Sequence, residues 1–88
     1  MDLKQKLKEM AELMDPVISD STVPRNIRAV LTEAKAKITR GEEDRGVQIA
    51  SAIYLLDDIS NDINMPFHTR TDIWNIISEL EKLKEEIK

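Results

Sequence analysis

The sequence predicts an all-α protein: a four-helix up-and-down bundle made of two similar helical hairpins in tandem. Apolar residues recur at spacings of three and four in four successive segments, as they do on one face of an amphipathic helix. Two Gly and three Pro in 88 residues supply too few turns for a many-stranded β fold. Heptad-like spacing in each segment favours crossing angles of about +20°, which is the geometry of a bundle. A short two-hairpin solenoid unit is the alternative.

We expect four helices, near residues 2–15, 23–40, 43–63 and 66–87. The first helix should end near Asp15, or one loose turn later at Ile18, because Pro16 removes an N–H from the helix ladder. The third helix is apolar over the widest arc, from Val47 to Ile63, and is therefore expected to be the most buried.

A glycine and a run of acids mark the boundary between the second and third helices. Gly41 follows Arg40 and is expected to end the second helix with a left-handed cap. Glu42, Glu43 and Asp44 should open the third helix, because acidic side chains are favoured at a helix N-terminus.

The two halves of the chain resemble each other when the sequence is shifted by 42 residues. Five identities carry the alignment: Leu13/Leu55, Asp15/Asp57, Asp20/Asp62, Pro24/Pro66 and Arg28/Arg70. A period of about 40 to 47 residues is typical of helical-hairpin repeats. The pattern predicts two helix–joint–helix units, and the alternative is two joints that meet the same geometric need independently.

Both joints share the pattern Asp-x-x-(Val/Met)-Pro. We expect Thr22 or Asn64 to be the N-cap and the proline to lie in the first turn of the following helix. Thr69-Arg70-Thr71-Asp72 also matches a capping box, but the repeat favours a fourth helix that has already begun by Pro66. Asp62 is expected to stabilise its turn by accepting hydrogen bonds from backbone N–H groups or from Arg70.

Composition limits the class of function. A single domain spanning residues 1–88 is expected from the length, and a net charge of −4 argues against a general nucleic-acid binder. The chain has no Cys, which excludes a disulfide, a thiolate nucleophile and Cys-ligated zinc. No apolar run approaches the roughly 20 residues of a membrane span, and the N-terminus lacks a signal peptide's apolar core. We therefore expect a cytoplasmic protein that does not enter the membrane.

Acidic residues and the single His gather around the second joint, at Asp57, Asp58, Asp62, His68 and Asp72. Such a set could form an oxygen-rich metal site in a metal-dependent enzyme. The Glu-x-x-His spacing of di-iron bundles and the Ca²⁺-loop pattern are both absent. A structural role in capping and pairing is therefore favoured, and no catalytic residue, cofactor or metal is expected.

Partner binding is the favoured function, because the chain offers helix faces and no reactive constellation. The candidate contact residues are Arg25, Arg28, His68, Arg70 and Trp74. Exposed Trp and Arg are enriched in interface hot spots. We expect a non-enzymatic protein–protein interaction module with an unknown protein partner or a second copy of itself. An accessory protein of RNA or ribonucleoprotein complexes, using the basic side of the second helix, is an alternative.

The second joint also carries a resemblance. Three stretches resemble an uncharacterised family of small archaeal helical proteins. They are Ile59-Ser60-Asn61-Asp62-Ile63-Asn64-Met65-Pro66, the following His68-Thr69-Arg70-Thr71, and the earlier Val23-Pro24-Arg25-Asn26-Ile27-Arg28. The resemblance covers most of the chain and implies a compact four-helix fold without an assigned activity. The family usually has Pro where this chain has Ile63, which implies a slightly longer third helix here.

Overall fold

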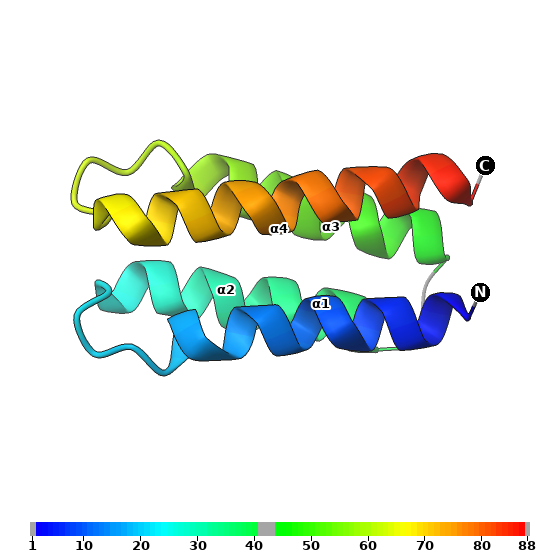
Figure 1. Cartoon of the computed structure of the whole chain (residues 1–88), viewed down its shortest axis with the longest axis horizontal. Coiled ribbons are helices and arrows are strands. Elements are labelled where there is room, and N and C mark those ends of the chain that lie inside the picture. Colours follow the sequence, from blue (N-terminus) through cyan, green and yellow to red (C-terminus); the bar gives the residue numbers. More distant parts are fainter. Residues whose placement is uncertain (1, 41–43, 88) are drawn as a thin grey trace.

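The chain forms four α-helices in a computed structural model that describes residues 2–40 and 44–87. Their bounds are α1 Leu3–Ile18, α2 Arg25–Thr39, α3 Arg45–Ile59 and α4 Phe67–Glu86. The helices run alternately up and down (Figure 1), which confirms the predicted all-α bundle. Over the described residues, none of them is long and apolar enough to cross a bilayer.

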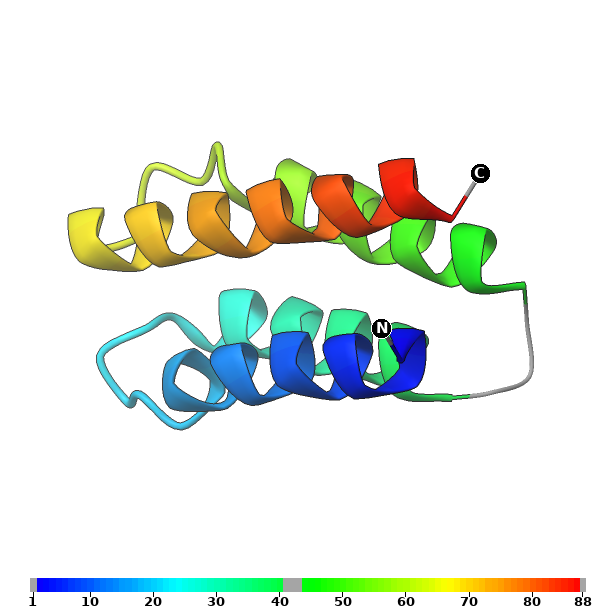
Figure 2. The same ribbon diagram turned by 45° about the vertical axis from the view of Figure 1, so that its right-hand side comes forward.

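Each helix contacts the two beside it, so α1, α2, α3 and α4 close a ring around one core. The bundle measures 35 × 19 × 18 Å. Both joints, α1–α2 and α3–α4, lie at the same end, and the two chain termini lie at the other end (Figures 1 and 2). The arrangement brings the first turns of α2 and α4, which are distant in sequence, to one end of the molecule.

The core is made of the apolar stripes that the spacing predicted. Fully buried side chains come from all four helices: Leu7, Met14, Ile27, Leu31, Ile38, Ile49, Leu56, Ile73 and Leu80. In α3, Ile49, Ala52 and Leu56 have no exposed surface, while Val47, which widened the predicted arc, is 51% exposed. Ile63, assigned to the same stripe, is 91% exposed.

The predicted end of α3 at residue 63 was wrong. The helix ends at Ile59, and Ser60 is its C-cap. The Asp62 N–H donates to the carbonyl of Ile59 at 3.0 Å, so the chain turns away from the helix axis before Ile63. In α1 the later predicted end is correct: the helix passes Pro16 and continues to Ile18, because one more turn buries Val17.

The prolines hold equivalent positions in the two joints. Pro24 and Pro66 are the N-caps of α2 and α4, with φ, ψ of −53°, 145° and −57°, 145°. The predicted N-caps, Thr22 and Asn64, were therefore wrong. A proline suits the N-cap because its fixed φ allows extended ψ and no N–H is needed there. α4 begins at Phe67, one residue after the start that the repeat predicted and before Thr69 of the alternative capping box, so each proline precedes the first turn in which it was predicted to lie.

The helix starts follow the predicted shift of 42 residues. Asp2 and Asp44 are the N-caps of α1 and α3, and each side chain accepts a backbone N–H two residues later, from Lys4 and Gly46. The duplication of one hairpin stays a prediction. The predicted roles of Gly41, Glu42 and Glu43 lie outside the described residues.

Candidate functional site

The joint end of the bundle holds the residues that the sequence singled out, and Asp62 is the centre of the second joint. Its carboxylate accepts the Asn64 N–H at 2.8 Å and Asn26 Nδ2 at 3.2 Å. The predicted acceptance of a backbone N–H is therefore confirmed. Arg70 contributes differently from expectation, because its Nη2 donates to the backbone carbonyl of Asp62 at 2.8 Å rather than to the carboxylate.

Asp20 occupies the same place in the first joint. Its carboxylate accepts the Thr22 N–H at 2.9 Å and the Thr22 hydroxyl at 2.6 Å. These two hydrogen bonds, with a smaller effect from the nearby His68, lower the pKa of the Asp20 carboxyl below its ordinary value. His68 Nε2 lies 3.9 Å from Asp20 Oδ2.

The two joints are therefore linked reciprocally. Asn26 is the second residue of α2 and reaches Asp62 of the other hairpin, while His68 is the second residue of α4 and approaches Asp20. The aspartate of each joint thus faces the start of the opposite hairpin's helix, through a hydrogen bond at Asp62 and a 3.9 Å approach at Asp20. Sequence reasoning placed these residues at the joints but did not pair them across the bundle.

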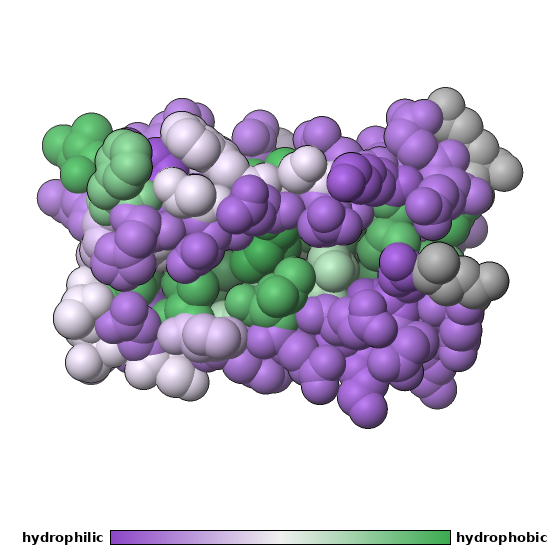
Figure 3. Space-filling view, in the orientation of Figure 1, coloured by the Kyte–Doolittle hydropathy of each residue, from purple (hydrophilic) through white to green (hydrophobic). Residues whose placement is uncertain are grey.

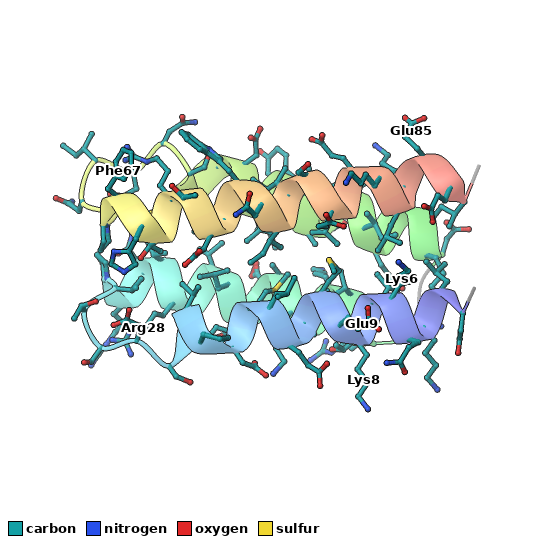
Figure 4. All side chains as sticks on the ribbon, in the orientation of Figure 1. Lys6, Lys8, Glu9, Arg28, Phe67 and Glu85 are labelled. Carbon is teal, nitrogen blue, oxygen red and sulfur yellow. The ribbon has the colours of Figure 1, made fainter. Side chains whose placement is uncertain are left out.

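Two of the candidate arginines are engaged in holding the joints. Arg28 Nε donates to the Val23 carbonyl at 3.0 Å, and Arg70 holds the carbonyl of Asp62. Both side chains are half-buried. Arg25, at the first position of α2, is exposed. Figure 4 places Arg28 and Phe67 at the same end of the bundle.

The acids around the second joint do not converge. Asp57, Asp58 and Asp72 are exposed on the helices, while Asp62 and His68 face the partners described above. In the parts of the chain that the structure describes, no group of three or more His, Asp or Glu side chains is placed to hold a metal ion.

Large apolar side chains are exposed at and beyond the second joint. Ile63 is 91%, Phe67 80% and Trp74 53% exposed, and we call these three residues the joint patch. Phe67 and Trp74 are seven residues apart on α4, which puts them on one helix face. The space-filling view shows a cluster of hydrophobic atoms at the α3–α4 joint (Figure 3). Of these three residues, the sequence had indicated only Trp74 as a contact residue.

The first hairpin has polar residues at the positions that match the joint patch. Ser21 lies in the first joint where Ile63 lies in the second. Arg25 and Phe67 are the first residues of α2 and α4, and Thr32 and Trp74 are the eighth. The fold therefore accommodates polar side chains at all three positions. Comparing the two halves at the 42-residue shift would have shown from sequence that the fold tolerates polar residues at these three positions.

Comparison with known proteins places the chain among proteins of the same size and fold. Residues 1–83 match the model of the uncharacterised protein family UPF0147. A UPF0147 protein of Methanocaldococcus jannaschii is 54% identical over 78 residues, which cover 89% of this chain and 84% of that protein. One from Archaeoglobus fulgidus is 48% identical over 83 residues, with 94% of both chains covered.

Two solved structures agree with this. The crystal structure of a UPF0147 protein from Thermoplasma acidophilum has a TM-score of 0.84 and 40% identity, covering 92% of this chain and 96% of that one. MMP1188, a protein of unknown function, has a TM-score of 0.82 and 51% identity, covering 86% of each chain. The family resemblance read from the second joint is confirmed, and the chain belongs to the uncharacterised family UPF0147.

Proposed function

We propose that this protein is a non-enzymatic protein–protein interaction module that binds its partner through the joint patch. The observation that carries the proposal is the exposure of Ile63, Phe67 and Trp74 at positions where the first hairpin has Ser21, Arg25 and Thr32. The fold does not need apolar residues at these positions. Contiguous exposed apolar surface is typical of interaction sites.

The chemistry of the patch suits an interface. Trp and Phe bury a large area with few rotatable bonds, and Trp is among the residues most enriched in binding hot spots. Covering Phe67, which is 80% exposed, would remove most of an aromatic ring from water. An exposed side chain of this kind contributes little to the stability of the isolated chain, so its benefit comes with a bound partner.

The polar residues of the joint end support the same conclusion. Asp20 and Asp62 accept hydrogen bonds within their own joints, and Arg28 and Arg70 donate to joint carbonyls. Asp62 and Arg70 fix the backbone of the second joint, beneath the patch, and Asp20 and Arg28 fix the backbone of the first joint. This gives a rigid platform, and rigid platforms lose less entropy on binding.

The alternative role on RNA has weaker support. On the basic side of α2, Lys35 Nζ pairs with Asp15 Oδ1 at 2.5 Å, and Arg28 is half-buried against Val23. Phosphate contacts need several cations that are free to reach the backbone of the nucleic acid. The basic residues of this helix are partly occupied within the fold.

Site-specific photo-crosslinking tests the proposal. The photoreactive residue p-benzoylphenylalanine is placed at position 67, and in a matched control at position 25, the equivalent first residue of α2. We expect a defined protein adduct, in lysate of an archaeon that carries a UPF0147 protein, from position 67 and not from position 25. The adduct is identified by mass spectrometry and purified.

Binding of the purified partner completes the test. Phe67→Arg, which introduces the residue of the equivalent position in α2, should weaken binding by at least about tenfold. Its melting temperature should stay close to that of the parent, because Arg25 is accommodated at the matching place. Equal adducts from both positions, or undiminished binding by Phe67→Arg, would contradict a role for the patch.

A further inference from the structure

We infer that the surface that covers the joint patch is basic: a protein segment with apolar side chains surrounded by Lys or Arg. The inference rests on the proposed function, since it names the chemistry of the partner at the same patch. Two observations carry it: the charge difference between the hairpins, and the position of the Asp57 carboxylate on the Trp74 side of the α3–α4 seam.

The two hairpins differ in charge. Residues 1–40 contain eight Lys and Arg and six Asp and Glu, a balance of +2. Residues 41–88 contain five Lys and Arg and eleven Asp and Glu, a balance of −6, and together these give the net −4 of the chain. The joint patch therefore belongs to the strongly acidic half.

The carboxylate of Asp57 lies on the same side of the α3–α4 seam as the patch. Ile53 of α3 borders a shallow surface hollow that is also lined by residues of α4, both acidic and basic: Ser78, Glu81, Lys82, Lys84 and Glu85. Asp57 is one helical turn beyond Ile53, and Trp74 is one turn before Ser78. Because α3 and α4 are antiparallel neighbours, both steps lead toward the joint, and Asp57 and Trp74 lie on the same side of the seam.

The carboxylate of Asp57 is exposed and available to a partner. Among the residues that the structure describes, no Lys, Arg or His nitrogen lies within 4.0 Å of the Asp57 carboxylate. A cation brought by the partner would meet this charge directly and would also speed association by electrostatic attraction. The rim of the patch therefore favours a basic partner.

A second copy in a two-fold dimer suits this surface less well. In an isologous interface each copy presents the same patch, so the acidic rims of the two copies would face each other. Like charges placed across an interface oppose binding. Charge complementarity thus separates the two occupants, and a basic partner is the one that satisfies it.

Trp74 provides a direct readout, because it is the only Trp in the chain and belongs to the patch. The full-length protein is titrated with three amphipathic helical peptides of about 18 residues. They share one Leu face and carry Lys, Gln or Glu on the other. We expect the Lys peptide to shift Trp74 emission to shorter wavelength and to protect it from acrylamide. Affinity should fall at least about tenfold between roughly 50 mM and roughly 500 mM salt.

Variants locate the binding. Asp57→Asn should weaken binding of the Lys peptide several-fold, and Phe67→Arg should abolish it. Asp72→Asn is the matched control, because Asp72 borders a hollow with Leu13 and Pro16 on the α1 side of α4. That change removes one carboxylate away from the patch and should leave the affinity within about twofold of the parent.

The outcomes separate this inference from the proposed function. Equal binding of the Gln or Glu peptide would overturn a basic partner and leave the patch as a docking site. A shift of the Trp74 emission that depends on protein concentration and occurs without peptide, together with a dimer in sedimentation, would assign the patch to a second copy. That result would also overturn the inference of a basic partner. Failure of all three peptides would also refute it, while crosslinking from position 67 decides the proposed function independently.

Discussion

At the scale of single residues, the two joints depend on one aspartate each. Asp20 and Asp62 accept the N–H of the residue two positions later, at 2.9 and 2.8 Å. This Asx turn leads the chain into an extended proline N-cap, so the following helix starts without a side-chain cap of its own. The aspartate thus substitutes for the capping residue that Thr22 or Asn64 was expected to be.

Changes at Asp62 should reveal this structural role. We expect Asp62→Asn to be mild, because the amide keeps an acceptor oxygen for the Asn64 N–H. Asp62→Ala should lower the free energy of unfolding by about 1–2 kcal/mol, as the loss of a cap does. Urea denaturation measures both, and Asp58→Ala, an exposed acid one turn away, should stay within about 0.5 kcal/mol of the parent.

Metal addition separates the structural role from a metal site at the same joint. The melts of the parent and of Asp62→Asn are repeated with and without divalent metal. We expect no metal-dependent rise in melting temperature. A rise in the parent that disappears in Asp62→Asn would identify a metal site and contradict the structural role.

Asp20 should make stability depend on pH. Hydrogen bonds from Thr22 lower the pKa of the Asp20 carboxyl in the folded protein, so the ionised form stabilises the fold. This contribution is present above the pKa of the unfolded chain and is lost as the pH falls through the folded pKa, from about pH 5 downward. Urea denaturation at a series of pH values should show a smaller acid-induced loss in Asp20→Asn than in the parent.

A second variant tests the cause. Thr22→Val removes the hydroxyl donor and keeps the backbone donor, so its acid-induced loss should lie between those of the parent and Asp20→Asn. Identical pH profiles for all three proteins would show that the Asp20 turn does not contribute.

At the scale of elements, helical spacing predicts the buried faces better than it predicts the ends. Within the observed helices, the central residues of all four stripes are buried as expected, because periodicity directly reports which side faces the core. The end of α3 depends on local hydrogen bonds instead. The Ser60 hydroxyl donates to the Asp57 carbonyl at 2.7 Å, and the chain turns there although apolar spacing continues to Ile63.

α3 also gives a quantitative prediction. Leu56 has no exposed surface, so Leu56→Ala should lower the free energy of unfolding by about 2–5 kcal/mol, the range for a large-to-small change in a packed core. Tyr54 lies on the same helix and is 73% exposed, so Tyr54→Ala is the matched control and should cost below about 0.5 kcal/mol. A loss below about 1 kcal/mol for Leu56→Ala, measured by urea denaturation, would place α3 at the periphery of the core.

At the scale of the whole molecule, the sequence predicted the bundle but not its candidate interface. The repeat indicated that both joints would be alike, and Pro24 and Pro66 hold equivalent positions. The joint patch was missed because an apolar residue after an apolar stripe, such as Ile63, is read as core. Only the position of the turn decides that this side chain faces solvent.

The ring of helices makes a prediction about chain connectivity. Each helix contacts its two neighbours, and each hairpin has its joint at the same end (Figure 1). Both termini lie at the opposite end, so a short Gly-Ser linker can join residue 87 to residue 2. A circular permutant that begins at Asp44 and ends at Arg40 should then keep every helix contact in the order α3, α4, α1, α2.

We expect this permutant to fold to the same bundle with nearly unchanged stability. Replacing one short connection by another of similar length changes the loop-closure entropy little, so the free energy of unfolding should stay within about 1 kcal/mol of the parent. Circular dichroism and urea denaturation measure this, and Trp74 emission reports whether the joint patch is preserved. As a control, a permutant opened within α3 between Ala52 and Ile53 breaks a helix whose Ala52 is fully buried, and it should be strongly destabilised. If opening before Asp44 destabilises the chain as much, the order of the two hairpins matters, and the description of the fold as two equivalent units fails.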